Sequence, residues 1–219
     1  MSSDLRKYLD LLDSIKHQDV DVQEADYTDE IEFGDSDSFD EVIEKVMQDE
    51  RNRIGYGDYR QTWHHPFDKR LVIKVAKPSE SKDYSVNDSR LRNTWEYLVW
   101  HLASSQDLPE KKFLMPCVDI HPDGDWLTMF KGERLPEDKP VSTKDKTDWI
   151  GDRKKDNYRI LDGKTLAVDY GSQTAAEHFD IPTEEKPAFR MLRKALRKQD
   201  KPVNNPDYGK STPHPDPES

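Results

Sequence analysis

The sequence predicts an α+β fold, and three segments carry that prediction. Residues 70–77 (RLVIKVAK) are apolar and rich in β-branched side chains, which is typical of a strand. Residues 88–102 repeat apolar side chains at helical spacing, which predicts a long amphipathic helix. Residues 158–168 contain two short apolar runs around Asp162-Gly163, a dipeptide that favours tight hairpin turns. Strands in hairpins together with separate helices indicate the α+β class.

Three oxygen-bearing side chains flank the predicted hairpin. Asp152 and Asn157 precede it, and Asp169 follows its second strand. Because a hairpin returns the chain to its starting point, we expect Asn157 and Asp169 to lie close together, with Asp152 at the loop entrance. Two such oxygen ligands can hold Mg²⁺ that carries polyphosphate, and a third carboxylate remains to accept a hydroxyl proton. The pattern therefore favours phosphoryl transfer.

This segment resembles the catalytic loop and metal-binding triplet of protein kinases. The family pattern H-R-D-x-x-x-x-N reads Ile150-Gly151-Asp152-x-x-x-x-Asn157 in this chain, and D-F-G reads Asp169-Tyr170-Gly171. Lys154 stands where many kinases have a catalytic-loop lysine. The histidine and the arginine of the pattern are both replaced. Loss of that arginine implies a site that is not switched by a phosphate on the activation segment.

The elements of a nucleotide-binding half stand upstream in the order that the resemblance implies. Gly55 and Gly57 form a Gly-x-Gly at the end of a predicted strand, where small residues let backbone amides approach phosphate, although the third glycine of the kinase pattern is missing. The strand that contains Lys74 is similar to the V-A-I-K strand of kinases, which makes Lys74 the expected phosphate-holding lysine. Glu96, in the predicted helix 88–102, is its expected partner; the alternative is a solvated helix glutamate.

Two further strands are predicted at Phe113–Pro116 and Trp126–Phe130, joined across Pro122-Asp123-Gly124. The end of the second strand resembles the kinase hinge, whose backbone hydrogen-bonds an adenine. The resemblance places the nucleotide base against four residues: Met129, Phe130, Lys131 and Gly132. Residues 59–68 also resemble small atypical kinase-like proteins of bacteria and the early protein kinases of tailed bacteriophages.

The resemblance implies a bilobal protein-kinase-like fold and an ATP-dependent phosphotransferase that uses Mg-ATP. It assigns catalytic roles to four residues: Asp152, Lys154, Lys74 and Glu96. Asp152 would orient or deprotonate the acceptor hydroxyl, and Lys154 would offset charge on the transferred phosphoryl group. Asn157 and Asp169 would hold the Mg²⁺. The expected acceptor is a serine or threonine of a protein substrate, and a small-molecule hydroxyl is the alternative.

Two other functions remain open at this point. One is a non-catalytic kinase-like regulatory protein that uses the same cleft to bind nucleotide, or presents its terminal helices to a partner. Retention of all five expected site residues argues against it: Lys74, Glu96, Asp152, Asn157 and Asp169. The short chain after the metal triplet, where kinases have several large helices, argues for it. The other is transfer of the nucleotide moiety instead of the terminal phosphate.

The chain divides into four parts by composition and pattern: a helix at residues 1–17, an acidic linker at 18–37, a kinase-like domain at 38–200 and a disordered tail at 201–219. Within the domain, the resemblance implies an antiparallel sheet with one main helix up to about residue 132 and an abbreviated second lobe beyond it. We expect the first helix to dock on the core; the alternatives are that it pairs with another chain or binds a partner. Ser38 and Glu41 form a capping box that predicts a helix through about Asn52.

Residues 182–198 predict one further helix with a narrow apolar stripe at Phe189, Leu192 and Leu196, opposite a basic face. That face is either a solvated surface or a binding surface for an acidic partner. The net charge of −11 disfavours nucleic acid as the partner.

Composition sets further limits. Of 219 residues, 33% are hydrophobic and 36% are charged, which fits one domain with polar tails. No apolar stretch approaches the roughly 20 residues of a membrane span, and the polar start does not resemble a secretory signal. Cys117 is the single cysteine, so no intrachain disulfide can form, and we expect it to be a buried strand residue. A cytoplasmic location, or host cytoplasm for a viral protein, is the expectation.

Overall fold

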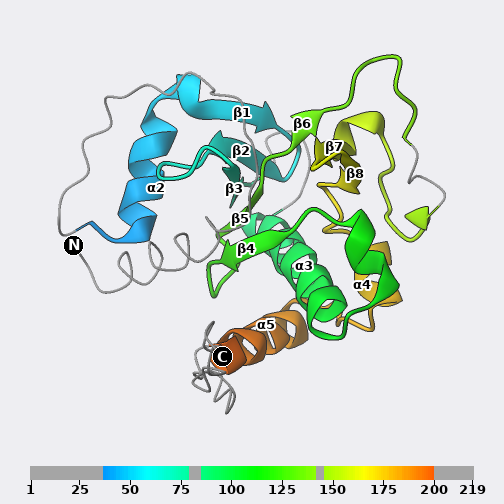
Figure 1. The fold of residues 1–219 in the computed structure, drawn as a ribbon. Helices are drawn as coiled ribbons and strands as arrows, with labels where there is room; N and C mark the ends of the chain where they lie inside the picture. The colour runs from blue at the N-terminus through cyan, green and yellow to red at the C-terminus, as the bar shows by residue number, and fades with distance from the viewer. Residues whose placement is uncertain (1–36, 79–84, 142–145, 200–219) are drawn as a thin grey trace, which may run out of the picture.

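The computed structural model describes residues 37–78, 85–141 and 146–199, and these residues form an α+β fold (Figure 1). A five-stranded antiparallel sheet has the order β1-β2-β3-β5-β4. A smaller antiparallel sheet has the order β6-β7-β8. The strands are β1 (Arg53–Tyr56), β2 (Arg60–His64), β3 (Leu71–Ala76), β4 (Cys117–Ile120), β5 (Trp126–Phe130), β6 (Glu133–Arg134), β7 (Tyr158–Leu161) and β8 (Lys164–Ala167). The predicted α+β class is confirmed.

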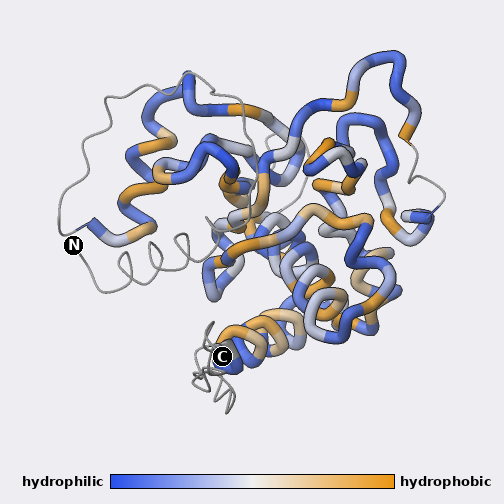
Figure 2. The backbone as a smooth tube through the Cα atoms, viewed as in Figure 1, coloured by the Kyte–Doolittle hydropathy of each residue, from blue (hydrophilic) through white to orange (hydrophobic). Residues whose placement is uncertain are grey.

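The described helices are α2 (Phe39–Gln48), α3 (Val86–Ser105), α4 (Gln173–His178) and α5 (Glu185–Gln199), with 3₁₀ turns at Glu50–Asn52, Pro109–Phe113 and Lys155–Asn157. Figure 2 shows hydrophobic and hydrophilic residues alternating along α2, whose apolar residues are buried. The capping box between Ser38 and Glu41 is present. The predicted extension of this helix to Asn52 is wrong. Asp49 is extended and its carboxylate accepts from the Arg51 amide, which begins a separate 3₁₀ turn.

Helix α3 is the central element of the fold. In Figure 1 it lies between the five-stranded sheet and α5, and it contacts β3, β4, β5, α4 and α5. Leu98, Val99 and Ala103 are fully buried, as the predicted apolar face requires. Asn93 and Thr94 are fully buried too, so α3 is enclosed on several sides. A helix in this position can bring polar side chains into the interior, where each needs a partner.

The strand predicted at Phe113–Pro116 is wrong. Phe113 ends a 3₁₀ turn, and the strand of this region is β4 (Cys117–Ile120). Pro116 has no amide hydrogen to contribute to a ladder, although its carbonyl accepts from Phe130. Instead of pairing within the larger sheet, Leu114 forms a bridge with Ala167, and the Met115 amide donates to the Ala167 carbonyl at 2.8 Å. This segment therefore links the two sheets.

The predicted hairpin is confirmed. β7 and β8 pair in antiparallel register with Leu161 opposite Lys164. The two turn residues, Asp162 and Gly163, have φ of 50° and 72°, as a hairpin turn with two left-handed residues requires. The second strand ends at Ala167, one residue earlier than expected.

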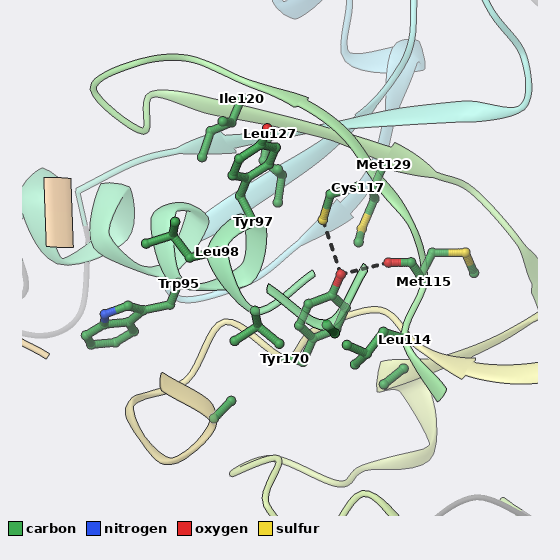
Figure 3. Close-up of a cluster of buried hydrophobic side chains, with 14 of the residues drawn as sticks. Trp95, Tyr97, Leu98, Leu114, Met115, Cys117, Ile120, Leu127, Met129 and Tyr170 are labelled. Carbon is green, nitrogen blue, oxygen red and sulfur yellow. Dashed lines mark hydrogen bonds between the residues drawn. The ribbon is translucent and has the colours of Figure 1, made fainter. Parts of the chain in front are cut away.

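Tyr170 lies in a cluster of buried hydrophobic side chains, where its hydroxyl finds two polar neighbours (Figure 3). The Tyr170 hydroxyl donates to the Met115 carbonyl at 2.7 Å and lies 3.2 Å from the Cys117 sulfur. Burial raises the pKa of both the Tyr170 phenol and the Cys117 thiol, so both groups stay neutral. Cys117 is a buried strand residue, as predicted. Tyr170, the middle residue of the Asp169-Tyr170-Gly171 triplet, thus fixes the segment after β8 to the chain that precedes β4.

Helix α5 packs on α3. It begins at Glu185, later than the predicted start at residue 182, and the Pro182 carbonyl accepts a hydrogen bond from the Trp95 indole at 3.1 Å. Phe189 and Leu192 are buried, and the basic side chains on the opposite face are exposed. No helix in the described part of the chain is both long enough and apolar enough to cross a membrane. The predicted helix at 1–17, nearly all of the linker at 18–37 and the tail at 201–219 lie outside the described residues.

His65, between β2 and β3, is fully buried and acts as an acceptor. Its Nδ1 accepts from the amides of Phe67 and Asp68 at 3.2 and 3.0 Å. Burial lowers the His65 pKa from 6.5 to about 3, with Asp68 acting weakly in the opposite direction. The imidazole is therefore neutral in the folded protein and accepts a proton on unfolding below pH 6.5.

We expect His65 to destabilise the fold as the pH falls from 6.5 towards 3, because the unfolded state binds the additional proton. The measurement is the urea unfolding free energy of wild type and His65→Gln across that range. The stability of wild type relative to the variant should fall by up to about 1.4 kcal/mol per pH unit. A difference between the two proteins that does not change with pH would contradict this assignment.

Candidate functional site

A cleft of about 420 Å³ lies where the two sheets meet. β1, β2, β3, the end of β5 and the residues after it line one side. β6, the turn before β7, β7, the segment after β8 and Arg92 of α3 contribute the rest. A larger hollow, of about 640 Å³, lies on the exposed face of α5. Among the described residues its lining comes from α5 alone, and one helix face does not enclose a small molecule. The cleft between the sheets is the candidate site.

Most of the residues predicted from the sequence line this cleft. They are Gly55, Gly57, Lys74, Met129, Phe130, Lys131, Gly132, Asn157 and Asp169. Glu96 lies behind the cleft wall, bonded to Lys74. Asp152 and Lys154 are exposed and do not line it. The structure thus brings together the residues that were predicted to bind nucleotide and metal. Asp152 and Lys154, which were predicted to act on the acceptor, lie outside this cleft.

The expected ion pair between Lys74 and Glu96 is present. The Lys74 Nζ donates to both carboxylate oxygens of Glu96, at 2.9 and 3.0 Å, and also to the Val168 carbonyl. Glu96 is fully buried, so the alternative of a solvated helix glutamate is wrong. The Tyr170 amide donates to the same carboxylate at 3.3 Å. Glu96 therefore joins β3, α3 and the segment that carries Asp169.

Arg60 is a member of the site that the sequence did not reveal. It begins β2 and is only 8% exposed. Its guanidinium donates to Glu96 and to Asp169, and to the Asn93 side chain at 3.3 Å. Burial acts to lower the Arg60 pKa, but the two carboxylates outweigh burial and raise it. One signal was available: Arg60 stands three residues after Gly57, at the position of the missing third glycine.

Asp169 points into the cleft and stays ionised. Burial acts to raise its pKa, but the charge of Arg60 and, more weakly, of Lys74 and Arg92 lowers it below the ordinary value. Its side chain keeps 45% of its surface exposed, so a ligand in the cleft can reach the carboxylate. Glu96, in contrast, has no exposed surface. Glu96 organises the site, and Asp169 presents a charge to it.

Asn157 and Asp169 lie on adjacent chain segments, as the hairpin predicted. The Val168 amide donates to the Asn157 carbonyl at 2.9 Å, and both predicted metal ligands line the cleft. Asn157 also orders the preceding loop, because its side-chain amide donates to the Asp152 carbonyl at 3.0 Å. Asp152 is paired with Lys154, whose Nζ lies 3.1 Å from its carboxylate.

The donor set in the cleft fits Mg²⁺ that arrives with polyphosphate. Within the described ranges, no group of three or more His, Cys, Asp or Glu side chains is arranged to hold a metal ion. Asn157 and Asp169 offer one amide and one carboxylate oxygen, and Arg60 already occupies the carboxylate. Mg²⁺ commonly takes one or two protein oxygens and completes its shell with phosphate and water. Asn157 and Asp169 are therefore the residues of the cleft that could hold Mg²⁺ bound to phosphate.

Comparison with known proteins adds no family. The sequence matches no protein-family model, and no curated protein matches it. The function of this chain is therefore inferred from the geometry and charge of the cleft.

We expect Glu96→Ala to cost about 3–5 kcal/mol of unfolding free energy, because it leaves Lys74 and Arg60 as buried cations without their shared carboxylate. Urea denaturation of the purified variant measures this loss. The matched control is Glu44→Ala, which removes an exposed glutamate from α2 and should change stability by less than about 0.5 kcal/mol. Equal stability of the two variants would show that the buried carboxylate does not organise the site.

Proposed function

We propose that this protein is an ATP-dependent phosphotransferase of the protein-kinase-like kind. The observation that carries the proposal is the convergence of three features on one cleft: the Lys74–Glu96 ion pair, the accessible carboxylate of Asp169 and the Gly-x-Gly segment. A buried lysine held by a buried glutamate presents a fixed positive charge, which suits a polyphosphate. Asp169 beside it suits the metal ion that accompanies the phosphates.

The arrangement of the two sheets supports a bilobal description. The five-stranded sheet with α3 corresponds to a nucleotide-binding half, and the smaller sheet with α4 and α5 corresponds to an abbreviated second half. The cleft lies at their junction. The base would lie against residues 129–132, where β5 ends, and the phosphates would extend toward Lys74 and Asp169.

The glycine segment would cover the phosphates, with one correction to the expected contacts. The Gly57 amide donates to the Arg60 carbonyl at 2.9 Å and closes the turn between β1 and β2. This amide is therefore not free to bind phosphate. Arg60, which follows the turn, brings a guanidinium into the cleft instead, and a guanidinium is a strong phosphate ligand.

The transfer step would move the terminal phosphoryl group of ATP to a hydroxyl oxygen of the acceptor. The bond between that phosphorus and the bridging oxygen of ADP breaks, and a new phosphorus–oxygen bond forms to the acceptor. Asp152 would take the hydroxyl proton, and Lys154 would leave Asp152 to offset charge on the transferred group. Mg²⁺ held by Asn157 and Asp169 supplies charge neutralisation of the phosphates. A serine or threonine of a protein is the proposed acceptor, because Asp152 lies on an exposed loop that a second protein can approach.

One observation favours a second candidate function, a non-catalytic regulatory protein that binds nucleotide. Arg60 holds Asp169 in an ion pair, and this carboxylate is the proposed metal ligand. If nucleotide binding leaves that ion pair intact, the cleft binds nucleotide without placing a metal for transfer. Catalysis requires Asp169 to exchange Arg60 for the metal.

We expect wild-type protein with Mg²⁺ and ATP labelled on the terminal phosphate to transfer label to itself or to lysate proteins, and Asp169→Ala to lose transfer by at least about a hundredfold. Binding is measured separately, from the rise in melting temperature with ATP. Binding without transfer in wild type would support the regulatory function. Absence of both would remove the proposal, and label retained from the alpha position would indicate transfer of the nucleotide moiety.

We expect Arg60→Gln to lower the Mg²⁺ concentration that half-saturates ATP binding by about tenfold, because it removes the cation that competes with the metal for Asp169. Titration of Mg²⁺ at fixed ATP measures this change. Arg92→Gln is the matched control, since Arg92 also lines the cleft but its guanidinium stacks on the Tyr59 ring at 3.6 Å. A Mg²⁺ requirement that is the same in wild type and Arg60→Gln would exclude competition at Asp169.

A further inference from the structure

A second group of cations lines the cleft, away from the Lys74–Glu96 pair. Lys131 follows β5, Arg134 ends β6 and Arg159 lies on β7, and all three line the same cavity. β6 and β7 pair in a register that sets Arg134 directly opposite Arg159. Like charges opposite one another on neighbouring strands destabilise a sheet. This register therefore has a cost unless an anion lies between the two guanidinium groups.

The charges at the two ends of the cleft are balanced differently. Near Asp169, Arg60 pairs with two carboxylates, those of Glu96 and Asp169. At the other end, Arg159 donates to backbone carbonyls and not to a carboxylate. Within the described ranges, the cations near Asp169 are paired with carboxylates, whereas Lys131, Arg134 and Arg159 form no ion pair.

Arg159 is held in a fixed position by the backbone. Its Nη1 donates to the carbonyls of Asp156 and Tyr158, at 2.7 and 2.8 Å. Gly132, with φ of 61°, lies against its stem, since a Cβ at Gly132 would come within 2.7 Å of the Arg159 Cβ. These contacts occupy one nitrogen of the guanidinium and leave its other donors for a ligand. Within the described ranges, the Arg134 side chain forms no ion pair or hydrogen bond, so its whole guanidinium is available.

We propose that Arg134 and Arg159, with Lys131, form a second anion-binding site in the cleft, which would hold a phosphate on the ribose of a nucleotide. This inference rests on the proposed function and narrows it: the preferred nucleotide would carry a ribose phosphate in addition to the phosphates on the 5′ side, and ATP would leave the second site empty. The chemistry that these residues recognise is a phosphate bound by two guanidinium groups, for which arginine is better suited than lysine.

The sheet register gives the spacing of the two ends. On β3, Lys74 pairs with Leu127, and Leu71 pairs with Phe130, next to the proposed base site. Three residues of strand span about 10 Å, which separates Lys74 from the chain that continues into Lys131 and Arg134. A nucleotide lying along the cleft would place its 5′ phosphates near Lys74 and its ribose hydroxyls toward the arginine pair.

The experiment compares the affinity of AMP with those of adenosine 2′,5′-bisphosphate and adenosine 3′,5′-bisphosphate, by isothermal titration calorimetry on the full chain. We expect at least one bisphosphate to bind wild type about tenfold more tightly than AMP, because it adds charge-assisted hydrogen bonds. Arg134→Gln should abolish this gain and leave the affinity for AMP within about twofold of wild type. Arg197→Gln, which removes an exposed arginine from α5, is the matched control and should keep the gain.

ATP is titrated into the same samples, so that failure of this inference and failure of the proposed function are distinguished. If ATP binds and neither bisphosphate exceeds AMP, or if the gain survives Arg134→Gln, the second anion site is overturned and the proposed function stands. If wild type binds none of these nucleotides, both fail. A gain that is equally lost in Arg197→Gln reports net charge rather than a site and also overturns the inference.

Discussion

The carboxylate of Glu96 is the interaction on which the rest of the site depends. It is fully buried and receives hydrogen bonds from Lys74 on β3, Arg60 on β2 and the Tyr170 amide. A buried charge is tolerated only when it is paired and its lone pairs are satisfied. Each partner comes from a different segment, so neutralising this one group fixes two strands and the segment after β8 around α3.

Buried contacts of the next two residues set the position of Asp169. Gly171 packs so closely on α3 that a Cβ there would collide with the Arg92 carbonyl, and Tyr170 is anchored to Met115. Asp169, which precedes these two residues, therefore has little conformational freedom and lies in the cleft beside Arg60. The triplet therefore acts as a structural clamp, in which a glycine allows close approach and a tyrosine hydroxyl satisfies a buried carbonyl.

Sequence patterns predicted the parts of this arrangement that are encoded locally. Apolar periodicity located the helix of Glu96, and the Asp-Gly turn located the hairpin that brings Asn157 to Asp169. The role of Arg60 was missed because its partner Asp169 is 109 residues away, and no local pattern encodes that contact. The opposition of Arg134 and Arg159 was missed because it depends on the register of a two-residue strand. Local propensity fixes elements, whereas such contacts follow from how the elements pack.

The four charges of this ion-pair network also determine how a nucleotide would enter. Two cations, Arg60 and Lys74, balance two carboxylates, Glu96 and Asp169, so the charges of these four side chains sum to zero without a ligand. A metal–phosphate complex supplies a new partner to each member of the Arg60–Asp169 pair, since the phosphate suits the guanidinium and the metal suits the carboxylate. Entry then exchanges one set of ion pairs for another and leaves no buried charge alone. Phosphate without a metal would satisfy Arg60 and leave Asp169 facing a like charge, so under the proposed function this end of the cleft would favour the complex over either component.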